Sequence, residues 1–185
     1  MPINVLYIHS SADLYGSDKS LLRLIQYRDA QRISPVVCLP YRGPLAEEIE
    51  RLGITVHIVD MGVVRRQHLD MFGIFELCLR TVSGAGALVL IIKEDEIDLV
   101  HTNTSAVFSG AIAARIARVP HVWHVREMYG LGRTAGRVYA AVIDRLSAAV
   151  VCVSGAVRDH LIRYREKCKE KCVVVHNGID VALYQ

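Results

Sequence analysis

The feature that most constrains the fold of this chain is a regular alternation of short apolar runs with longer helical segments. The apolar runs are continuous rather than alternating, which is typical of parallel strands covered on both faces. Strand and helix in alternation favour a doubly wound sheet with right-handed crossovers. We predict an α/β, Rossmann-like, mainly parallel sheet of about seven strands with helices on both faces. The expected strands are residues 4–9, 35–40, 55–60, 98–103, 121–125, 149–154 and 172–176.

Helical segments are expected between these strands, and several have recognisable ends. Ser17 is expected to cap the first helix, and Thr104 or Ser105 the fourth. Pro44 is placed to start the second helix, and Gly53 to follow its end. The expected helices are residues 17–28, 44–52, 72–95, 106–118, 134–147 and 156–165.

Length and charge narrow the class of protein. A chain of 185 residues fits one domain with a substantial core. A net charge of +3 gives no reason to expect a nucleic-acid partner. Basic residues gather in the stretch 158–171, which is typical of a solvated helix and also of a surface for anionic membrane. The expected location is the cytoplasm, with peripheral association at the inner face of the membrane as a further possibility.

Two apolar segments bear on that expectation. The run 4–10 is too short for a signal peptide and lacks a basic start. Residues 72–92 approach the length of a membrane span, but Glu76 and Arg80 interrupt them, so we expect a mostly buried helix. Cys38 and Cys152 fall in expected core strands, and reduced thiols are expected.

Polar residues follow most of the expected strands at one edge of the sheet. Ligands of open parallel sheets bind beyond the carboxyl ends of the strands. Because side chains alternate along a strand, His101 and Asn103 should share a face, as should His124 and Arg126, with Glu127 pointing the other way. Several histidines there raise the possibility of a metal site, but no H-E-x-x-H or paired-cysteine spacing supports it. Substrate contact is the favoured interpretation, with no metal.

The turn after the first strand offers a second candidate site. It contains neither G-x-G-x-x-G nor G-K-[ST], which argues against a dinucleotide turn and excludes a P-loop. Gly16 and Ser17 nevertheless precede a helix N-terminus, where a phosphate could approach free N–H groups. A turn glycine followed by a serine cap explains the same residues equally well.

The end of the sequence suggests a domain boundary. An apolar run leads into Asn177-Gly178, a step that usually announces further structure, and only seven residues follow. We therefore expect residues 1–176 to form one domain and 177–185 to begin an interdomain linker, with a C-terminal domain absent from this chain.

Together these motifs resemble a known family. The series comprises Tyr15-Gly16-Ser17, Val100-His101-Thr102-Asn103, Pro120-x3-His124-x-Arg126-Glu127, Val153-Ser154 and Val174-x-His176-Asn177-Gly178-Ile179-Asp180. In this order they resemble the N-terminal half of a family 4 glycosyltransferase with the two-domain GT-B fold, over essentially the whole chain.

The resemblance implies retaining transfer of a sugar from a nucleotide-sugar to an acceptor hydroxyl, with no cofactor beyond that co-substrate. It implies a diphosphate contact at Gly16 and Ser17, and a catalytic role for His124, Arg126 or Glu127. Many members carry a histidine where this chain has Arg126, so the residue nearest the reacting sugar is left open between Arg126 and His124. The implied acceptor is a glycan, a lipid-linked molecule or a small molecule.

The remaining polar residues at strand ends complete the expected site. The expected acceptor contacts are His9, Ser10, Tyr15, His101, Asn103 and Thr104, and the expected cleft or hinge residues are Ser154, Asn177 and Gly178. The isolated chain is expected to be inactive. The competing interpretations are a self-contained Rossmann-type module that binds a nucleotide or sugar phosphate, and a structural subunit whose polar residues only cap strand ends.

Overall fold

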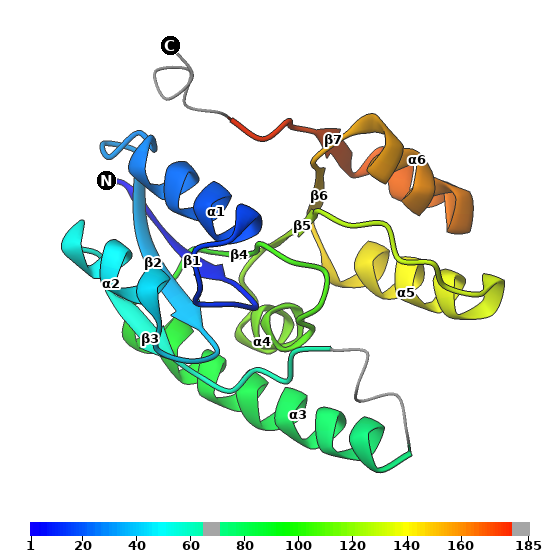
Figure 1. The fold of residues 1–185 in the computed structure, drawn as a ribbon, viewed down its shortest axis with the longest axis horizontal. Coiled ribbons are helices and arrows are strands. Elements are labelled where there is room, and N and C mark those ends of the chain that lie inside the picture. The colour runs from blue at the N-terminus through cyan, green and yellow to red at the C-terminus, as the bar shows by residue number, and fades with distance from the viewer. Residues whose placement is uncertain (65–70, 179–185) are drawn as a thin grey trace.

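In the computed structural model, which describes residues 1–64 and 71–178, seven strands form one parallel sheet (Figure 1). Their order is β3-β2-β1-β4-β5-β6-β7. This confirms the predicted Rossmann-like fold class and all seven expected strands. The strands are β1 (Ile3–Ile8), β2 (Ile33–Leu39), β3 (Val56–Ile58), β4 (Leu99–Thr102), β5 (His121–Val125), β6 (Ala149–Cys152) and β7 (Cys172–Val174).

The helices lie between the strands as expected, and the second has the predicted ends. Pro44 is its first residue, and Gly53, with φ +74°, follows its end. The left-handed conformation at Gly53 is one that glycine adopts without strain. The helices are α1 (Gly16–Gln26), α2 (Pro44–Arg51), α3 (Met71–Glu94), α4 (Ser109–Ala117), α5 (Arg133–Leu146) and α6 (Gly155–Tyr164).

The helix caps predicted for α1 and α4 are wrong. The N-cap of α1 is Tyr15 rather than Ser17, and the N–H of Tyr15 donates to the carboxylate of Asp18 at 2.9 Å. Helix α4 begins at Ser109 instead of near residue 106. The segment before α4 is held instead by a hydrogen bond from the indole of Trp123 to the carbonyl of Thr104 at 2.8 Å and by one from the N–H of Ala106 to the Thr104 hydroxyl at 3.1 Å.

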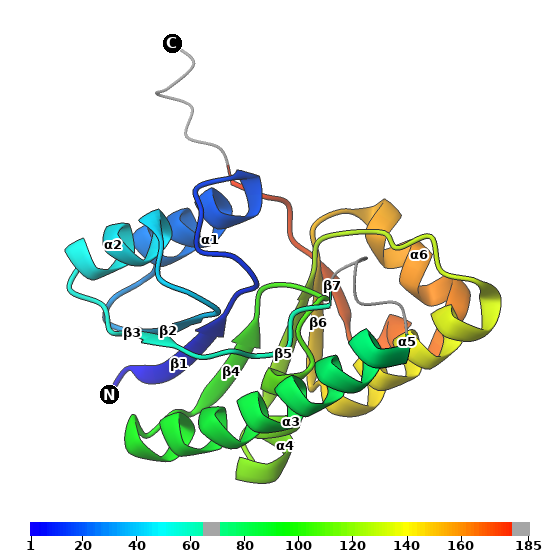
Figure 2. The ribbon, with the colours of Figure 1, turned by 60° about the horizontal axis from the view of Figure 1, so that its bottom comes forward.

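The two faces of the sheet are covered by different helices. Leu6 and Val100 are paired neighbours on one face and belong to a core cluster with α3 and α4, while Trp123 on the same face packs against α5 and α6. Val5 and Tyr7 point to the other face and pack against α1 and α2. The connections from β1 and β4 therefore leave to opposite faces, as Figure 2 shows, which creates a topological switch point between these two strands.

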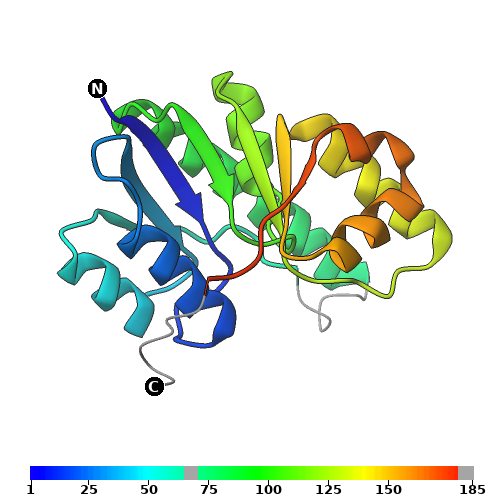
Figure 3. The same ribbon diagram turned by 90° about the horizontal axis from the view of Figure 1, so that it is seen from above.

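The face that carries α1 is covered unevenly. Among the described residues, the core cluster on this face stops at β4, and Val122, Val151 and Val173 belong to no cluster. The exposed fraction of Val173 is 55%. After β7, the chain passes across the carboxyl edge of the sheet toward α1 (Figure 3).

Helix α3 contradicts the expectation of a mostly buried helix. Only 22% of its most apolar window is buried, and by length and composition alone this helix could span a membrane. Its buried side packs Gly84, Ala85 and Leu88 against the domain. The exposed apolar residues of the other side are spaced by three, four, three and eight positions, which places them on one face of the helix as a stripe. This α3 stripe consists of Phe72, Phe75, Leu79, Val82 and Leu90.

Candidate functional site

Two hollows flank the switch point at the carboxyl ends of β1, β4 and β5. The first, which we call the Arg126 hollow, has a volume of about 470 Å³. It is lined by Ser20, Arg23, Leu24, Tyr27, His124, Arg126 and residues 175–178. The second, the Glu127 hollow, has a volume of about 870 Å³. It is lined by Ser10, Val63, Val64, Thr104, Ala106 and residues 127–131.

The end of β5 divides the predicted catalytic residues between these hollows. His124 and Arg126 line the first and Glu127 lines the second. This is the alternation predicted from the sequence, because successive side chains of a strand point to opposite faces. Of the three predicted catalytic residues, the structure therefore brings two together and places the third in the other hollow.

Arg126 is held by two amide oxygens. One guanidinium nitrogen donates to Oδ1 of Asn103 at 2.8 Å, and the other donates to Oδ1 of Asn177 at 2.7 Å. Burial lowers the pKa of Arg126, and the neighbouring Glu127 carboxylate opposes that shift. Because an arginine remains protonated over the physiological range, the Arg126 hollow has a fixed cation at its wall.

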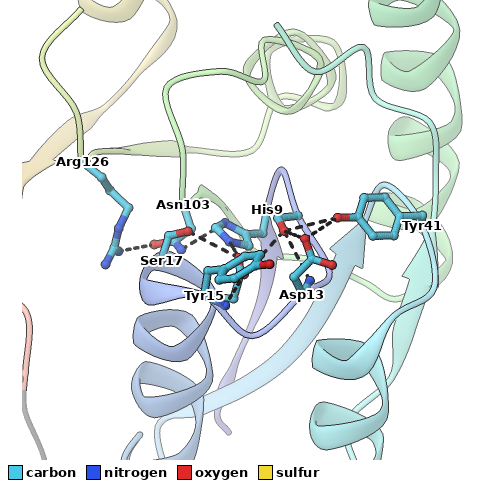
Figure 4. Close-up of polar contacts among 9 residues, drawn as sticks. His9, Asp13, Tyr15, Ser17, Tyr41, Asn103 and Arg126 are labelled. Atoms are coloured by element: carbon cyan, nitrogen blue, oxygen red, sulfur yellow. Dashed lines mark hydrogen bonds and ion pairs between the residues drawn. The ribbon is translucent and has the colours of Figure 1, made fainter. Parts of the chain in front are cut away.

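A buried hydrogen-bond network continues from Asn103 to the start of α1 (Figure 4). Asn103 Nδ2 lies 3.3 Å from Nδ1 of His9, and Nε2 of His9 lies 2.7 Å from Oδ1 of Asp18. His9 and Asn103 were predicted to contact an acceptor, but they are 1% and 0% exposed. Both ring nitrogens of His9 are engaged in the network, so its acceptor role stays a prediction with little open surface to support it.

Sequence reasoning missed Asp18 as a member of the site. The exposed fraction of its side chain is 1%. Burial alone would raise the pKa of Asp18, but hydrogen bonds from His9 and from the N–H of Tyr15 hold it below its usual range. The available signal was an acidic residue at the third position of a helix, where a carboxylate reaches back to the N-cap N–H.

His101 and His124 form a neutral pair beside Arg126. Nε2 of His101 lies 3.3 Å from Nδ1 of His124. Burial and the charge of Arg126 lower the pKa of His101 to about 4 and that of His124 to about 3. Among the described residues, Nε2 of His124 is buried without a hydrogen-bond partner. These imidazoles are therefore hydrogen-bonding groups at neutral pH rather than charges.

The predicted phosphate-contact residues lie at the open start of α1. No atom lies within 4 Å of the position that a Cβ at Gly16 would occupy, so a ligand could approach the backbone there. The Ser17 hydroxyl lies 3.4 Å from Asp18, and the neighbouring Tyr15 is 75% exposed. The free N–H groups of a helix start favour an anion, and the diphosphate contact at Gly16 and Ser17 stays a prediction.

The other predicted site residues have clear positions. Ser10 and Thr104 line the Glu127 hollow. Ser154 caps α6 by accepting from the N–H of Val157 at 3.3 Å, which accounts for it structurally. Asn177 also accepts from Ser20 of α1 at 3.2 Å. Gly178 O lies 3.5 Å from a guanidinium nitrogen of Arg23, and residues 179–185 lie outside the described residues.

Neither the histidines nor the cysteines gather into a ligand cluster in the described part of the chain. No three His, Cys, Asp or Glu side chains of residues 1–64 and 71–178 are grouped so as to hold a metal ion. The expectation of a site without metal stays a prediction.

Comparisons with known proteins give one family match and several structures of similar fold. The family model described as Glycosyltransferase Family 4 matches residues 15–183. A search of curated proteins found no match. Crystal structures of Anabaena Alr3699/HepE are similar: the complex with UDP has a TM-score of 0.72 at 25% identity, and the complex with UDP-glucose has 0.74 at 24%. Both alignments cover 98% of this chain and 46% of that chain.

A glycosyltransferase from Rickettsia africae ESF-5 has the same fold. Its structure has a TM-score of 0.70 at 17% identity, and the alignment covers 100% of this chain and 45% of that chain. This chain thus spans about half the length of these neighbours and has the fold of the N-terminal half of GT-B glycosyltransferases. With the family model matched over residues 15–183, the chain belongs to glycosyltransferase family 4.

Proposed function

We propose that this chain is the acceptor-side half of a retaining glycosyltransferase that moves a sugar from a nucleotide-sugar to an acceptor hydroxyl. The observation that carries the proposal is Arg126, a fixed cation at the switch point, beside the open start of α1. Departure of a nucleotide diphosphate leaves negative charge. Preorganised cations and helix N-terminal amides are the groups that stabilise such charge in a transition state.

The donor-binding half is proposed to lie in a C-terminal domain that follows the linker starting at residue 177. The support is that this chain spans about half of the Anabaena neighbour, which was crystallised with UDP and with UDP-glucose. A nucleotide-sugar is accordingly the proposed co-substrate, with no further cofactor.

The Glu127 hollow is the proposed acceptor site. Its wall combines the carboxylate of Glu127 with the hydroxyls of Ser10 and Thr104 and with the apolar side chains of Val63 and Met128. Such a wall suits an acceptor with a hydroxylated end and an apolar end. A lipid-linked glycan fits this description better than a small polar sugar.

The isolated chain is expected to show no sugar transfer and at most millimolar affinity for UDP-glucose, because one wall of the proposed cleft lies outside it. Isothermal titration calorimetry of the isolated chain and of the complete protein, together with a transfer assay, checks this. Micromolar binding of UDP-glucose by the isolated chain would contradict the proposed assignment of donor binding to a C-terminal domain. It would favour a self-contained nucleotide-binding module.

We also propose that the protein works in the cytoplasm, bound peripherally to the inner face of the membrane through the α3 stripe. The exposed fractions of Phe72 and Phe75 are 86% and 65%, and the charges of Glu76 and Arg80 on this helix are paired with each other. The basic stretch 158–171 supports this less than expected. Arg165 and Lys171 contact Asp144, so part of that stretch serves the fold. Five free cysteines agree with a reducing compartment.

Replacing both Phe72 and Phe75 with serine is expected to lower membrane binding by at least about tenfold, because each buried aromatic ring contributes about 1.5–3 kcal/mol. Flotation of the complete protein with vesicles of phosphatidylglycerol and phosphatidylethanolamine measures this. The control is Val138→Ser, which removes an exposed apolar side chain from α5. Equal flotation of the double variant and the control would count against the α3 stripe.

A further inference from the structure

We propose that Asp18 is a positioning residue that fixes both Arg126 and the start of α1, and that it acts through one tautomer of His9. The inference rests on the proposed function, in which Arg126 and the α1 amides face the donor diphosphate. It assigns a task to a carboxylate that lies in neither hollow.

The two oxygens of Asp18 serve two different parts of the site. Oδ2 accepts from the N–H of Tyr15 at 2.9 Å, and Tyr15 is the N-cap that sets where α1 begins. Oδ1 lies 2.7 Å from Nε2 of His9. A single side chain therefore connects the turn that carries Gly16 to the path that leads to Arg126.

Hydrogen-bond directions along that path are fixed by chemistry. The ionised carboxylate of Asp18 only accepts, so Nε2 of His9 must carry the proton. Arg126 only donates, so Oδ1 of Asn103 must face the guanidinium at 2.8 Å and the amide NH₂ of Asn103 must face His9. Nδ1 of His9, 3.3 Å from that NH₂, is then an unprotonated acceptor.

The opposite amide orientation would be incompatible with Arg126. A proton on Nδ1 of His9 would turn the oxygen of Asn103 toward the ring and its NH₂ toward the guanidinium, which also only donates. Arg126 would then lose Oδ1 of Asn103 as an acceptor and would keep only Oδ1 of Asn177, in the exposed segment that follows β7. The tautomer of His9 thus decides whether Arg126 is held on both sides.

Because the network is buried, its hydrogen bonds cannot be exchanged for hydrogen bonds to water. His9, Asp18 and Asn103 are each no more than 1% exposed, so water does not replace a lost partner. An unsatisfied buried polar group costs about 1–3 kcal/mol, which favours the complete network over any partial one. A carboxylate that only stabilised the helix start would not require these directions, and this difference makes the proposal testable.

The kinetic test compares variants of His9 and Asp18 in the complete protein with UDP-glucose and a lipid-linked acceptor extract. Gln at position 9 has an NH₂ that can donate to Asp18 and an oxygen that can accept from Asn103, whereas Leu has neither. We expect kcat of His9→Gln to stay within about threefold of the parent value. In His9→Leu and in Asp18→Asn, kcat should fall about 10²-fold, because misplacement of a catalytic group lowers the rate by about that factor. The KM for the donor should change less than kcat in both variants. Equal losses in His9→Gln and His9→Leu would overturn the proposal and leave His9 a packing residue.

The spectroscopic test does not depend on transfer activity. With ¹⁵N-histidine labelling of the complete protein, His9 is expected to show a protonated Nε2 and an unprotonated Nδ1, and Asp18→Asn should mix the two tautomers. A protonated Nδ1 of His9 in the parent protein would refute the proposed hydrogen-bond path from Asp18 to Arg126, even if the enzyme were active. If no sugar transfer were found while the expected tautomer was observed, the proposed function would fail and the path would stand.

Discussion

Replacing Arg126 with alanine is expected to lower turnover of the complete protein by about 10²–10³-fold, the effect typical of losing one preorganised group that stabilises transition-state charge. The free energy of unfolding should fall by only about 1–2 kcal/mol, since the change leaves the buried Oδ1 of Asn103 without its donor. Steady-state kinetics and urea unfolding measure the two effects separately. The prediction therefore requires a large loss of rate at a small loss of stability.

Two further variants make that result specific. Arg126→Lys keeps a charge but not two parallel donors, so an intermediate rate is expected. Arg115→Ala removes an exposed arginine from α4, on the opposite face of the sheet, and serves as the matched control. Equal turnover of Arg126→Ala and Arg115→Ala would contradict the proposal that Arg126 stabilises charge in the transition state.

Acidification of this chain from pH 7 to pH 5 is expected to lower its free energy of unfolding by about 2 kcal/mol for each of two buried histidines. Burial, with the charge of neighbouring side chains, lowers the pKa of His121 and of His124 to about 3. In the unfolded chain these rings take up protons near pH 6.5, so as pH falls the unfolded state binds more protons than the folded state. Their destabilising effect is therefore absent above about pH 6.5 and grows as the pH falls toward 3.

Urea unfolding at half-unit steps of pH checks this expectation, and His121→Gln supplies the comparison. Whatever its stability at pH 7, the variant should show a shallower dependence on pH between 6.5 and 4.5, because one titrating ring is gone. Above pH 7 both proteins should show the same slope. Parallel curves over the whole range would contradict a neutral, buried His121.

The alternating pattern of the chain was sufficient to predict the sheet, because continuous apolar strands and intervening helices leave few topologies. It was also sufficient to separate Arg126 from Glu127, since the period of a strand is two residues. Element ends were less predictable. Helix α4 starts later than expected, and the segment before it is held by a hydrogen bond from Trp123, 19 residues further along the chain, to the carbonyl of Thr104.

The sequence could not show two features that depend on what a segment packs against. Helix α3 is apolar on both sides, and no pattern within residues 72–92 says that only one side meets the domain. Asp18 is an acidic residue in the first turn of α1, a position that by itself indicates only a contact with the helix start. Its partner His9 has its other ring nitrogen against Asn103, 94 residues away, and no local rule connects those positions.

The division of β5 between two hollows has a consequence for how such a protein diversifies. Residues 127–131 line one compartment while His124 and Arg126 line the other. Because the two hollows both adjoin the end of β5 but have no lining side chain in common, substitutions at Met128 or Leu131 reshape the Glu127 hollow without altering the walls of the Arg126 hollow. Under the proposed roles, acceptor preference is free to drift during evolution while the chemistry of leaving-group departure stays under separate selection.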